Sequence, residues 1–132
     1  MARILVADDE ESLRHFLNRA LSARGHEVVT VGAGTEALDA LSAGSFDLLL
    51  SDVVMPELDG IALALRVSRD YPKLPIVIMT GFMSAKARAE DLSDLVRRIV
   101  PKPFSLEEIC RHVEEALRPV APSGPAQPTS AL

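Results

Sequence analysis

The stretch from Leu48 to Gly60 reads L-L-L-S-D-V-V-M-P-E-L-D-G, and the rest of the predicted fold is arranged around it. Its leucines and serine form a short apolar run, as expected of a strand that is buried on both faces. Asp52 stands where the run ends, which places a carboxylate at the rim of a sheet. Pro56 then removes a backbone donor, and Asp59-Gly60 is typical of a tight turn before a helix. The sequence predicts that a rigid strand holds Asp52 beside a loop, although an aspartate that merely ends a strand has the same pattern.

Length and composition limit the possibilities. The chain has 132 residues, of which 48% are hydrophobic, and this suits one domain with a single core. The net charge is −5, and no basic cluster is longer than Arg97-Arg98, which argues against nucleic-acid binding. Cys110 lies in a helical pattern and is predicted to be a buried apolar residue rather than a reactive thiol. No stretch approaches the roughly 20 apolar residues of a membrane span, so we expect a cytoplasmic protein without membrane association.

Short β-branched or leucine-rich runs alternate with amphipathic helical patterns, as in parallel βαβ units. Thr35 is predicted to cap the second helix, and Ser105 and Glu108 form a capping box before the last one. The predicted strands are residues 3–7, 26–31, 48–52, 75–79 and 97–100, and the third and fourth helices are predicted at 60–70 and 84–94. The residues predicted to face the core are Leu13, Phe16, Leu17, Ala20 and Leu21; Ala37, Leu38 and Leu41; Ile61, Ala64, Leu65 and Val67; Ala85, Ala89, Leu92 and Leu95; and Leu106, Ile109, Cys110, Val113 and Leu117. The helix at 84–94 offers mainly alanines to the core, so we expect it to be the least firmly packed.

Residues 119–132 differ in composition from the rest of the chain. They carry no charged side chain, and the sequence predicts a proline-rich disordered tail behind a domain that spans residues 1–118. The prolines recur every third residue, which would align them on one side of a polyproline II helix if a partner held the segment extended.

Polar residues follow the predicted strands at the points where the strands end. Asp8 and Asp9 follow the first strand, Asp52 the third, Thr80 the fourth and Lys102 the fifth. In an open parallel sheet, ligands bind outside the carboxyl ends of the strands. Carboxylates that meet there repel one another by about 1 to 4 kcal/mol per pair at ~4 Å unless a cation intervenes. Mg²⁺ takes few direct carboxylates and keeps several waters, so it suits this set better than Ca²⁺. A metal, a lysine and a hydroxyl around one carboxylate are what phosphoryl transfer needs.

Four separate motifs carry a resemblance to a known family. They are D-D at 8–9, S-D-V-V-M-P-E-L-D-G at 51–60, T-G at 80–81 and K-P-F at 102–104. With these motifs, residues 3–118 resemble the receiver domain of bacterial two-component response regulators. The resemblance implies an α/β fold of the flavodoxin-like (βα)5 type, with a five-stranded parallel sheet in the order 2-1-3-4-5 and helices on both faces.

The resemblance also implies a metal site around a phosphoacceptor. By position, Asp52 matches the residue that accepts the phosphoryl group. Asp9 matches the direct ligand of Mg²⁺, Asp8 the acid that holds a water of the metal, and Val54 the residue whose backbone carbonyl binds the metal.

Three further positions match residues around the phosphoryl group. Thr80 matches the switch hydroxyl, and Lys102 matches the lysine that pairs with the phosphoryl group, whose bond to Pro103 is often cis in the family. Gly81 is small, as access to the phosphoryl group requires.

The function that follows from the resemblance is a single-domain response regulator. A histidine kinase or a histidine phosphotransfer protein would phosphorylate Asp52 in the presence of Mg²⁺, and the signal would leave through phosphorylation-dependent protein contact. Such a protein is a switch, not an enzyme with a free substrate, and its only reactions are its own phosphorylation and dephosphorylation. The opening M-A-R-I-L-V-A-D-D and M-T-G-F at 79–82 also resemble stand-alone receivers that act as adaptors for regulated proteolysis. A phosphate shuttle or sink in a phosphorelay is the alternative.

Two positions depart from the family pattern. Receivers commonly place Tyr or Phe where this chain has Ile99, and the usual Gly-Ala turn before the fifth strand is replaced by residues 93–95. Ile99 is too short and too apolar to swing as the aromatic residue does. We therefore expect backbone movement of the helix at 84–94 to carry more of the signal, and the face made with the fifth strand and last helix to bind a partner.

Two other functions fit parts of the sequence. Residues 32–37 fit the dinucleotide fingerprint G-x-G-x-x-A, but they follow the second strand rather than the first and leave Lys102 unexplained. A phosphatase with an aspartate nucleophile needs a second acid two residues beyond it, where this chain has Val54. A receiver that is not phosphorylated is a further alternative, although every expected site residue is present.

Overall fold

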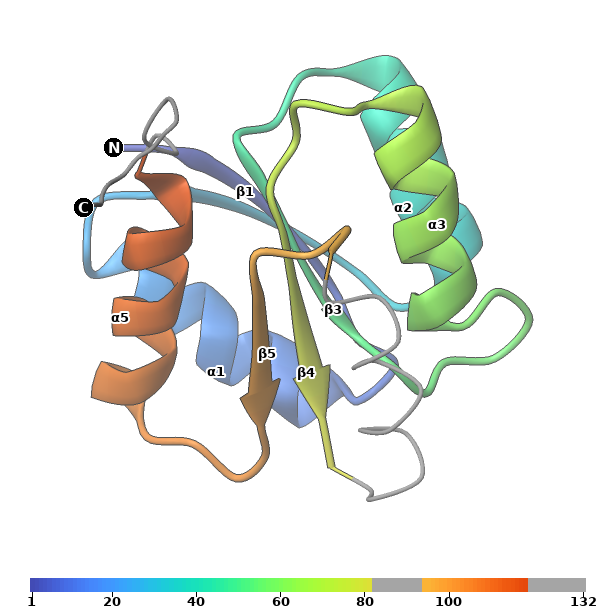
Figure 1. Cartoon of the computed structure of the whole chain (residues 1–132). Coiled ribbons are helices and arrows are strands. Elements are labelled where there is room, and N and C mark those ends of the chain that lie inside the picture. The colour runs from blue at the N-terminus through green and yellow to red at the C-terminus, as the bar shows by residue number, and fades with distance from the viewer. Residues whose placement is uncertain (82–93, 119–132) are drawn as a thin grey trace, which may run out of the picture.

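The structure is a computed structural model, and it describes residues 1–81 and 94–118. Five parallel strands form one sheet in the order β2-β1-β3-β4-β5, with helices on both faces (Figure 1). The strands are β1 (Arg3–Ala7), β2 (Glu27–Val31), β3 (Leu48–Asp52), β4 (Ile76–Thr80) and β5 (Arg98–Pro101). The described helices are α1 (Glu11–Ser22), α2 (Gly34–Ala43), α3 (Gly60–Asp70) and α5 (Leu106–Leu117). The predicted flavodoxin-like fold and strand order are confirmed; the helix predicted at 84–94 and the segment 119–132 lie outside the described residues, apart from Asp94.

Strand β3 is the centre of the sheet. It pairs with β1 on one side and β4 on the other, and all five of its residues are buried. A strand in this position needs an apolar side chain on both faces, which explains the three consecutive leucines. The register sets Ala7 beside Ser51 and Asp52 beside Met79, so the strands end close to one another at one rim.

Helices cover both faces of the sheet (Figure 1), and the core has two layers, one on each face. Successive strand residues point to opposite faces, so Leu49 packs toward α2 and α3 while Leu50 packs toward α1 and α5. The buried helix residues on the first face are Ala37, Leu41, Leu63, Ala64 and Val67, and those on the second are Leu17, Ala20, Leu21, Ile109, Cys110, Val113 and Ala116.

Three predicted core residues are exposed. Leu65 is 48% exposed, because the buried stripe of α3 runs through Leu63 instead. Leu106 is 43% exposed because it opens α5 on the solvent side, whereas the predicted Leu117 packs, partly buried, against the same core as the buried Ala116. Leu95 is 42% exposed and lies in a turn, not in a helix.

The predicted cap of the second helix is wrong. Helix α2 begins at Gly34, and its N-cap is Ala33, which offers no side-chain hydrogen bond. Thr35 therefore lies inside the first turn. Glu36 bonds instead to the chain before the helix, where its Oε1 accepts a hydrogen bond from the backbone N–H of Gly32 at 2.8 Å.

The last helix is built as predicted at its start. The Ser105 hydroxyl accepts from the Glu108 N–H at 3.0 Å, and the Glu108 carboxylate accepts from the Ser105 N–H at 2.8 Å. Cys110 is fully buried in the core, as predicted, and this burial raises the pKa of its thiol, which disfavours the reactive thiolate. Among the described residues, no helix combines the length and apolar character of a membrane span.

Candidate functional site

Three carboxylates meet at the carboxyl ends of β1 and β3. Asp8, Asp9 and Asp52 each offer an oxygen, and these three oxygens lie within 4.8 Å of one another. Asp8 is fully buried and Asp52 is 7% exposed, whereas Asp9 is exposed. Carboxylate oxygens are the ligands that hard divalent cations prefer, so the predicted acids form a group that could hold a metal ion.

The oxygens of Asp8 already have partners. Oδ1 accepts a hydrogen bond from the backbone N–H of Glu10 at 2.8 Å, and Oδ2 accepts one from the Lys102 ammonium at 3.3 Å. In the described part of the chain, by contrast, no hydrogen bond or ion pair engages the side chain of Asp9. The two neighbouring acids therefore differ in how freely they could bind a cation directly.

Lys102 bridges the acids from the loop after β5. Its Nζ lies 3.3 Å from Oδ2 of Asp8 and 3.3 Å from Oδ1 of Asp52. The backbone N–H of Lys102 donates to the Thr80 carbonyl at 2.8 Å, which fixes the loop to the end of β4. The Lys102-Pro103 peptide bond is cis, as the resemblance suggested. One ammonium thus offsets part of the repulsion among three carboxylates.

The surroundings of Asp52 would favour the binding of a further cation. Burial raises the pKa of the Asp52 carboxyl above its ordinary value. The Lys102 ammonium opposes this rise, and the Asp8 carboxylate adds to it. The hydrogen bond from the Val53 N–H to Oδ1 at 2.9 Å also favours the ionised form. A bound cation would act in the same direction as Lys102.

Thr80, Gly81 and Val54 complete the predicted set. Thr80 is 3% exposed at the end of β4, and Gly81 follows it on the surface. A Cβ on Gly81 would lie 3.7 Å from Cδ of Lys102, which is ordinary contact, so the space beside the lysine is open. The side chain of Val54 is 47% exposed in the loop after β3.

Gly60 is a site residue whose role the sequence reasoning missed. A Cβ on Gly60 would overlap the carbonyl oxygen of Asp52 and lie 2.9 Å from Cα of Val53. The Gly60 N–H also donates to the Val53 carbonyl at 2.8 Å. The start of α3 therefore packs directly on the backbone that carries Asp52, which only glycine permits. Asp59 was correctly placed before this helix, where its carboxylate accepts from the Ala62 N–H.

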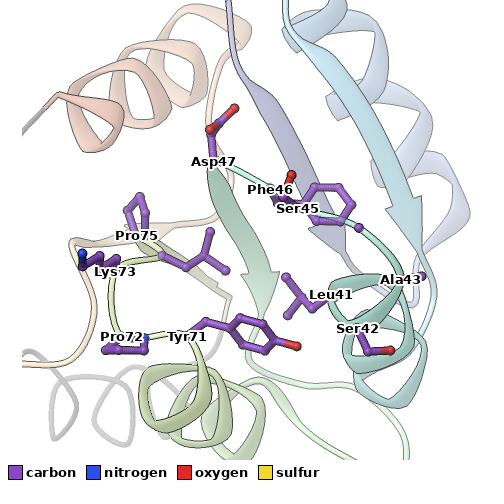
Figure 2. Close-up of a pocket in the computed structure, with 12 residues that line it drawn as sticks. Leu41, Ser42, Ala43, Ser45, Phe46, Asp47, Tyr71, Pro72, Lys73 and Pro75 are labelled. Atoms are coloured by element: carbon purple, nitrogen blue, oxygen red, sulfur yellow. The ribbon is translucent and has the colours of Figure 1, made fainter.

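A separate hollow lies at the other end of the sheet. A groove of about 640 Å³ opens between residues 41–47 and 71–75, before β3 and β4. Figure 2 shows Leu41, Phe46 and Tyr71 along it. Because ligands of open parallel sheets bind outside the carboxyl ends of the strands, this groove is not part of the candidate site.

Comparisons with known proteins agree with this geometry. The family described as response regulator receiver domain matches residues 4–114. The response regulator receiver protein CpdR of Brucella abortus (strain 2308) is 37% identical over 117 residues, which are 89% of this chain and 98% of CpdR. The DNA-binding transcriptional regulator NtrC of Escherichia coli (strain K12) is 37% identical over 114 residues. These residues are 86% of this chain but 24% of NtrC, so the chain spans about a quarter of that relative.

Solved structures give the same result. The response regulator TrrA of Thermotoga maritima, in complex with Mg²⁺-BeF, superposes with a TM-score of 0.80 at 30% identity, covering 88% of this chain and 99% of TrrA. The Francisella response regulator 1452 receiver domain superposes with a TM-score of 0.80 at 26% identity, covering 89% and 97%. The sheet order, the acidic rim and the sequence matches together show that the chain belongs to the response regulator receiver domain family.

Proposed function

We propose that this protein is a phosphoacceptor switch whose Asp52 is phosphorylated by a histidine kinase or a histidine phosphotransfer protein with Mg²⁺ as the cofactor. The observation that carries the proposal is the meeting of three carboxylates with one ammonium. Nζ of Lys102 lies 3.3 Å from oxygens of both Asp8 and Asp52, while Asp9 completes the acidic group. This arrangement supplies the charges that phosphoryl transfer requires.

The donor set fits Mg²⁺. Asp9 is the natural direct ligand because its carboxylate is exposed and has no other described partner. Asp8 would hold a water of the metal, since both of its oxygens already accept hydrogen bonds. An oxygen of Asp52 and the backbone carbonyl of Val54 would complete the protein ligands. Bound there, the ion would neutralise charge on the phosphoryl oxygens during transfer.

The transfer makes one bond and breaks another. A carboxylate oxygen of Asp52 attacks the phosphorus of a phosphohistidine, so a P–O bond forms as the P–N bond breaks, and the imidazole leaves with the electron pair. Asp52 must be ionised to attack, and Lys102 favours the ionised form. After transfer, the Lys102 ammonium would pair with the phosphoryl oxygens and the Thr80 hydroxyl would bond to one of them.

A turnover enzyme is not the function that this site supports best. Release of a phosphoryl group to water in repeated cycles would use a general acid near the nucleophile. The position two residues beyond Asp52 is Val54, which has no titratable side chain. We therefore limit the chemistry to phosphorylation and dephosphorylation of the protein itself.

The output we propose is protein contact. The chain matches 98% of the length of CpdR, a receiver protein, which supports a signal that leaves from the receiver surface. The resemblance of residues 1–9 and 79–82 to proteolysis adaptors favours a protease-adaptor role, and a phosphate shuttle or sink is the second candidate. A pull-down with phosphorylated and unphosphorylated protein, followed by mixing of the phosphorylated protein with a phosphotransfer protein, distinguishes the two roles. An adaptor retains a partner in only one phosphorylation state, whereas a shuttle passes its phosphoryl group to the phosphotransfer protein.

Phosphorylation itself is tested with a small phosphodonor. With Mg²⁺ the protein should gain one phosphoryl group, and a chelator should prevent the gain. Asp52→Ala should gain none, whereas Asp39→Ala, which removes an exposed aspartate of α2, should be labelled like the wild type. Equal labelling of Asp52→Ala would refute the proposal.

A further inference from the structure

The junction between β2 and α2, residues 31–36, contacts both loops that carry the acidic site. The function proposed above gives this junction no role, and its two glycines produced the misleading dinucleotide pattern. Gly34 faces the loop after β3, whereas Gly32 faces the side chain of Arg14 in α1, which bonds to the loop after β1.

On one side the junction meets the loop after β1. The backbone N–H of Asp8 donates to the Val31 carbonyl at 3.1 Å. From α1, the Arg14 guanidinium donates to the Asp8 carbonyl at 2.7 Å. The guanidinium lies against Gly32, where a Cβ would be only 3.2 Å from Nη1 of Arg14. Both backbone polar groups of Asp8 are therefore held from outside its own loop.

On the other side the junction meets the loop after β3. A Cβ on Gly34 would overlap the carbonyl oxygen of Leu58 and lie 3.1 Å from Cβ of Leu58. One residue earlier in that loop, Glu57 has a φ of 66°, a left-handed conformation that a residue other than glycine adopts only when its surroundings impose it. The absence of a side chain on Gly34 thus lets α2 support the loop that follows Asp52.

Backbone support matters most for two of the proposed metal ligands, the Asp9 carboxylate and the Val54 carbonyl. In the described residues, nothing bonds to the Asp9 side chain, so the peptide between Asp8 and Asp9 decides where its carboxylate points. The Val54 carbonyl is part of the backbone of the second loop and moves with it. A shift of either loop would change the spacing of the oxygens around the cation.

We propose that the β2–α2 junction fixes the two loops of the metal site relative to each other, with Arg14 and Gly34 as positioning residues. The inference rests on the proposed function in one respect, because it takes these loops to bind Mg²⁺. It also gives the glycines of residues 32–37 a role in close packing rather than in binding a dinucleotide.

The test uses two variants with matched controls. Arg14→Met removes the hydrogen bond to Asp8 but keeps an unbranched side chain, and Arg19→Met makes the same change at an exposed position of α1. The methyl group of Gly34→Ala would clash with the carbonyl oxygen of Leu58, whereas for Gly44→Ala, at the other end of the sheet, the three atoms nearest to the added Cβ all belong to the side chain of Arg3. The two measurements are the Mg²⁺ Kd of the full-length unphosphorylated protein and amide hydrogen exchange in the presence of a chelator.

We expect Arg14→Met and Gly34→Ala to raise the Mg²⁺ Kd about tenfold, as losses of supporting contacts around metal ligands do. Exchange should become faster in residues 8–10 for the first variant and in 53–59 for the second. Arg14→Lys, which keeps a donor, should recover part of the affinity. The two control variants should match the wild type in both measurements.

A wild-type Kd in both folded variants would overturn the inference, even if their stability fell, because that result describes a purely structural contact. If Gly34→Ala does not fold, the Mg²⁺ Kd of Arg14→Met alone decides whether the inference holds. The proposed function fails separately: a wild-type protein that binds no Mg²⁺ contradicts the metal site, while faster exchange in the variants would still show that the junction positions the loops.

Discussion

At Asp52 the fold places a carboxylate where burial opposes its charge. Burial raises its pKa, and Lys102 offsets this only in part. The pKa of Asp52 in the folded protein is above its ordinary value in the unfolded chain. At any pH between these two pKa values, the folded protein therefore binds more protons than the unfolded chain. The stability that Asp52 contributes is therefore present below its ordinary pKa and is lost as the pH rises through the raised one.

Neutralising Asp52 should thus stabilise the metal-free protein. We expect Asp52→Asn to raise the free energy of unfolding by about 1 kcal/mol at neutral pH, since it removes repulsion from neighbouring acids. Urea unfolding in a chelator measures the change, and repeating it in acid should shrink the difference. A less stable Asn variant at neutral pH would show that Lys102 fully compensates the carboxylate.

The charge of Lys102 should matter more to phosphorylation than to folding. Its side chain is 22% exposed and reaches over the rim rather than into the core. We expect Lys102→Ala to keep a cooperative unfolding transition but to lose phosphorylation or the conformational response to it. Lys73→Ala, an exposed lysine at the other end of the sheet, is the control. Loss of the fold in Lys102→Ala would instead indicate a structural lysine.

The sequence predicted which charged residues lie together at the rim of the sheet. It did not predict the glycines that pack against the loops carrying those residues. Asp8, Asp9 and Lys102 could be placed together because parallel strands end at one rim. Gly60 and Gly34 could not be recognised, since their importance depends on backbones that approach one another only in the folded chain. A glycine at the start of a helix has no pattern that distinguishes close packing from a simple turn.

Among the elements, α5 has the best-defined start. In its capping box, the side chains of Ser105 and Glu108 each accept a hydrogen bond from the backbone N–H of the other residue. The hydrogen bond from the Ser105 backbone, followed by the one with its side chain, lowers the pKa of Glu108. The contribution of this carboxylate to stability is therefore present above its ordinary pKa and is lost as the pH falls through the lowered one.

Removing the cap should have a measurable cost. Ser105→Ala should lower the free energy of unfolding by about 1 kcal/mol, because an N-cap hydroxyl is lost. Ser68→Ala is the control: its hydroxyl bonds to the Leu65 carbonyl within α3 and is exposed. Equal stability of the two variants in urea would mean that the box contributes nothing.

Helix faces were harder to predict than helix positions. The bounds of α3 match residues 60–70, yet Leu65 proved exposed and Leu63 buried. The segment carries apolar residues on more than one side, and the sheet decides which side is covered. The buried residues of β3 were easier to predict, because every residue of a strand that is covered on both faces is buried.

For the whole molecule, the domain should end with α5. The guanidinium of Arg97 donates to the carbonyls of Ala116 and Arg118 at 2.7 and 3.0 Å, so the end of the helix is satisfied by the domain itself. We expect truncation after Arg118 to leave phosphorylation of Asp52 unchanged. A truncated chain that folds but is not labelled would contradict this.

The route of the signal is also a property of the whole molecule. Ile99 is half-buried and packs against the core layer on the face of the sheet that α2 and α3 cover, at a position where the family commonly has an aromatic side chain. We expect a phosphoryl mimic to change amide hydrogen exchange in residues 81–100, because Thr80 at the rim leads directly into that segment. Changes limited to the loop after Asp52 would show that the signal takes another route.

The proposed function depends most on the identity of the phosphorylated residue. The direct measurement is intact mass after incubation with a phosphodonor and Mg²⁺, followed by reduction of the acyl phosphate with borohydride and sequencing of the peptide that contains residue 52. We expect one phosphoryl group per chain, located on Asp52 and missing when Mg²⁺ is chelated. A label on any other residue, or one that persists without the metal, would contradict the proposed function.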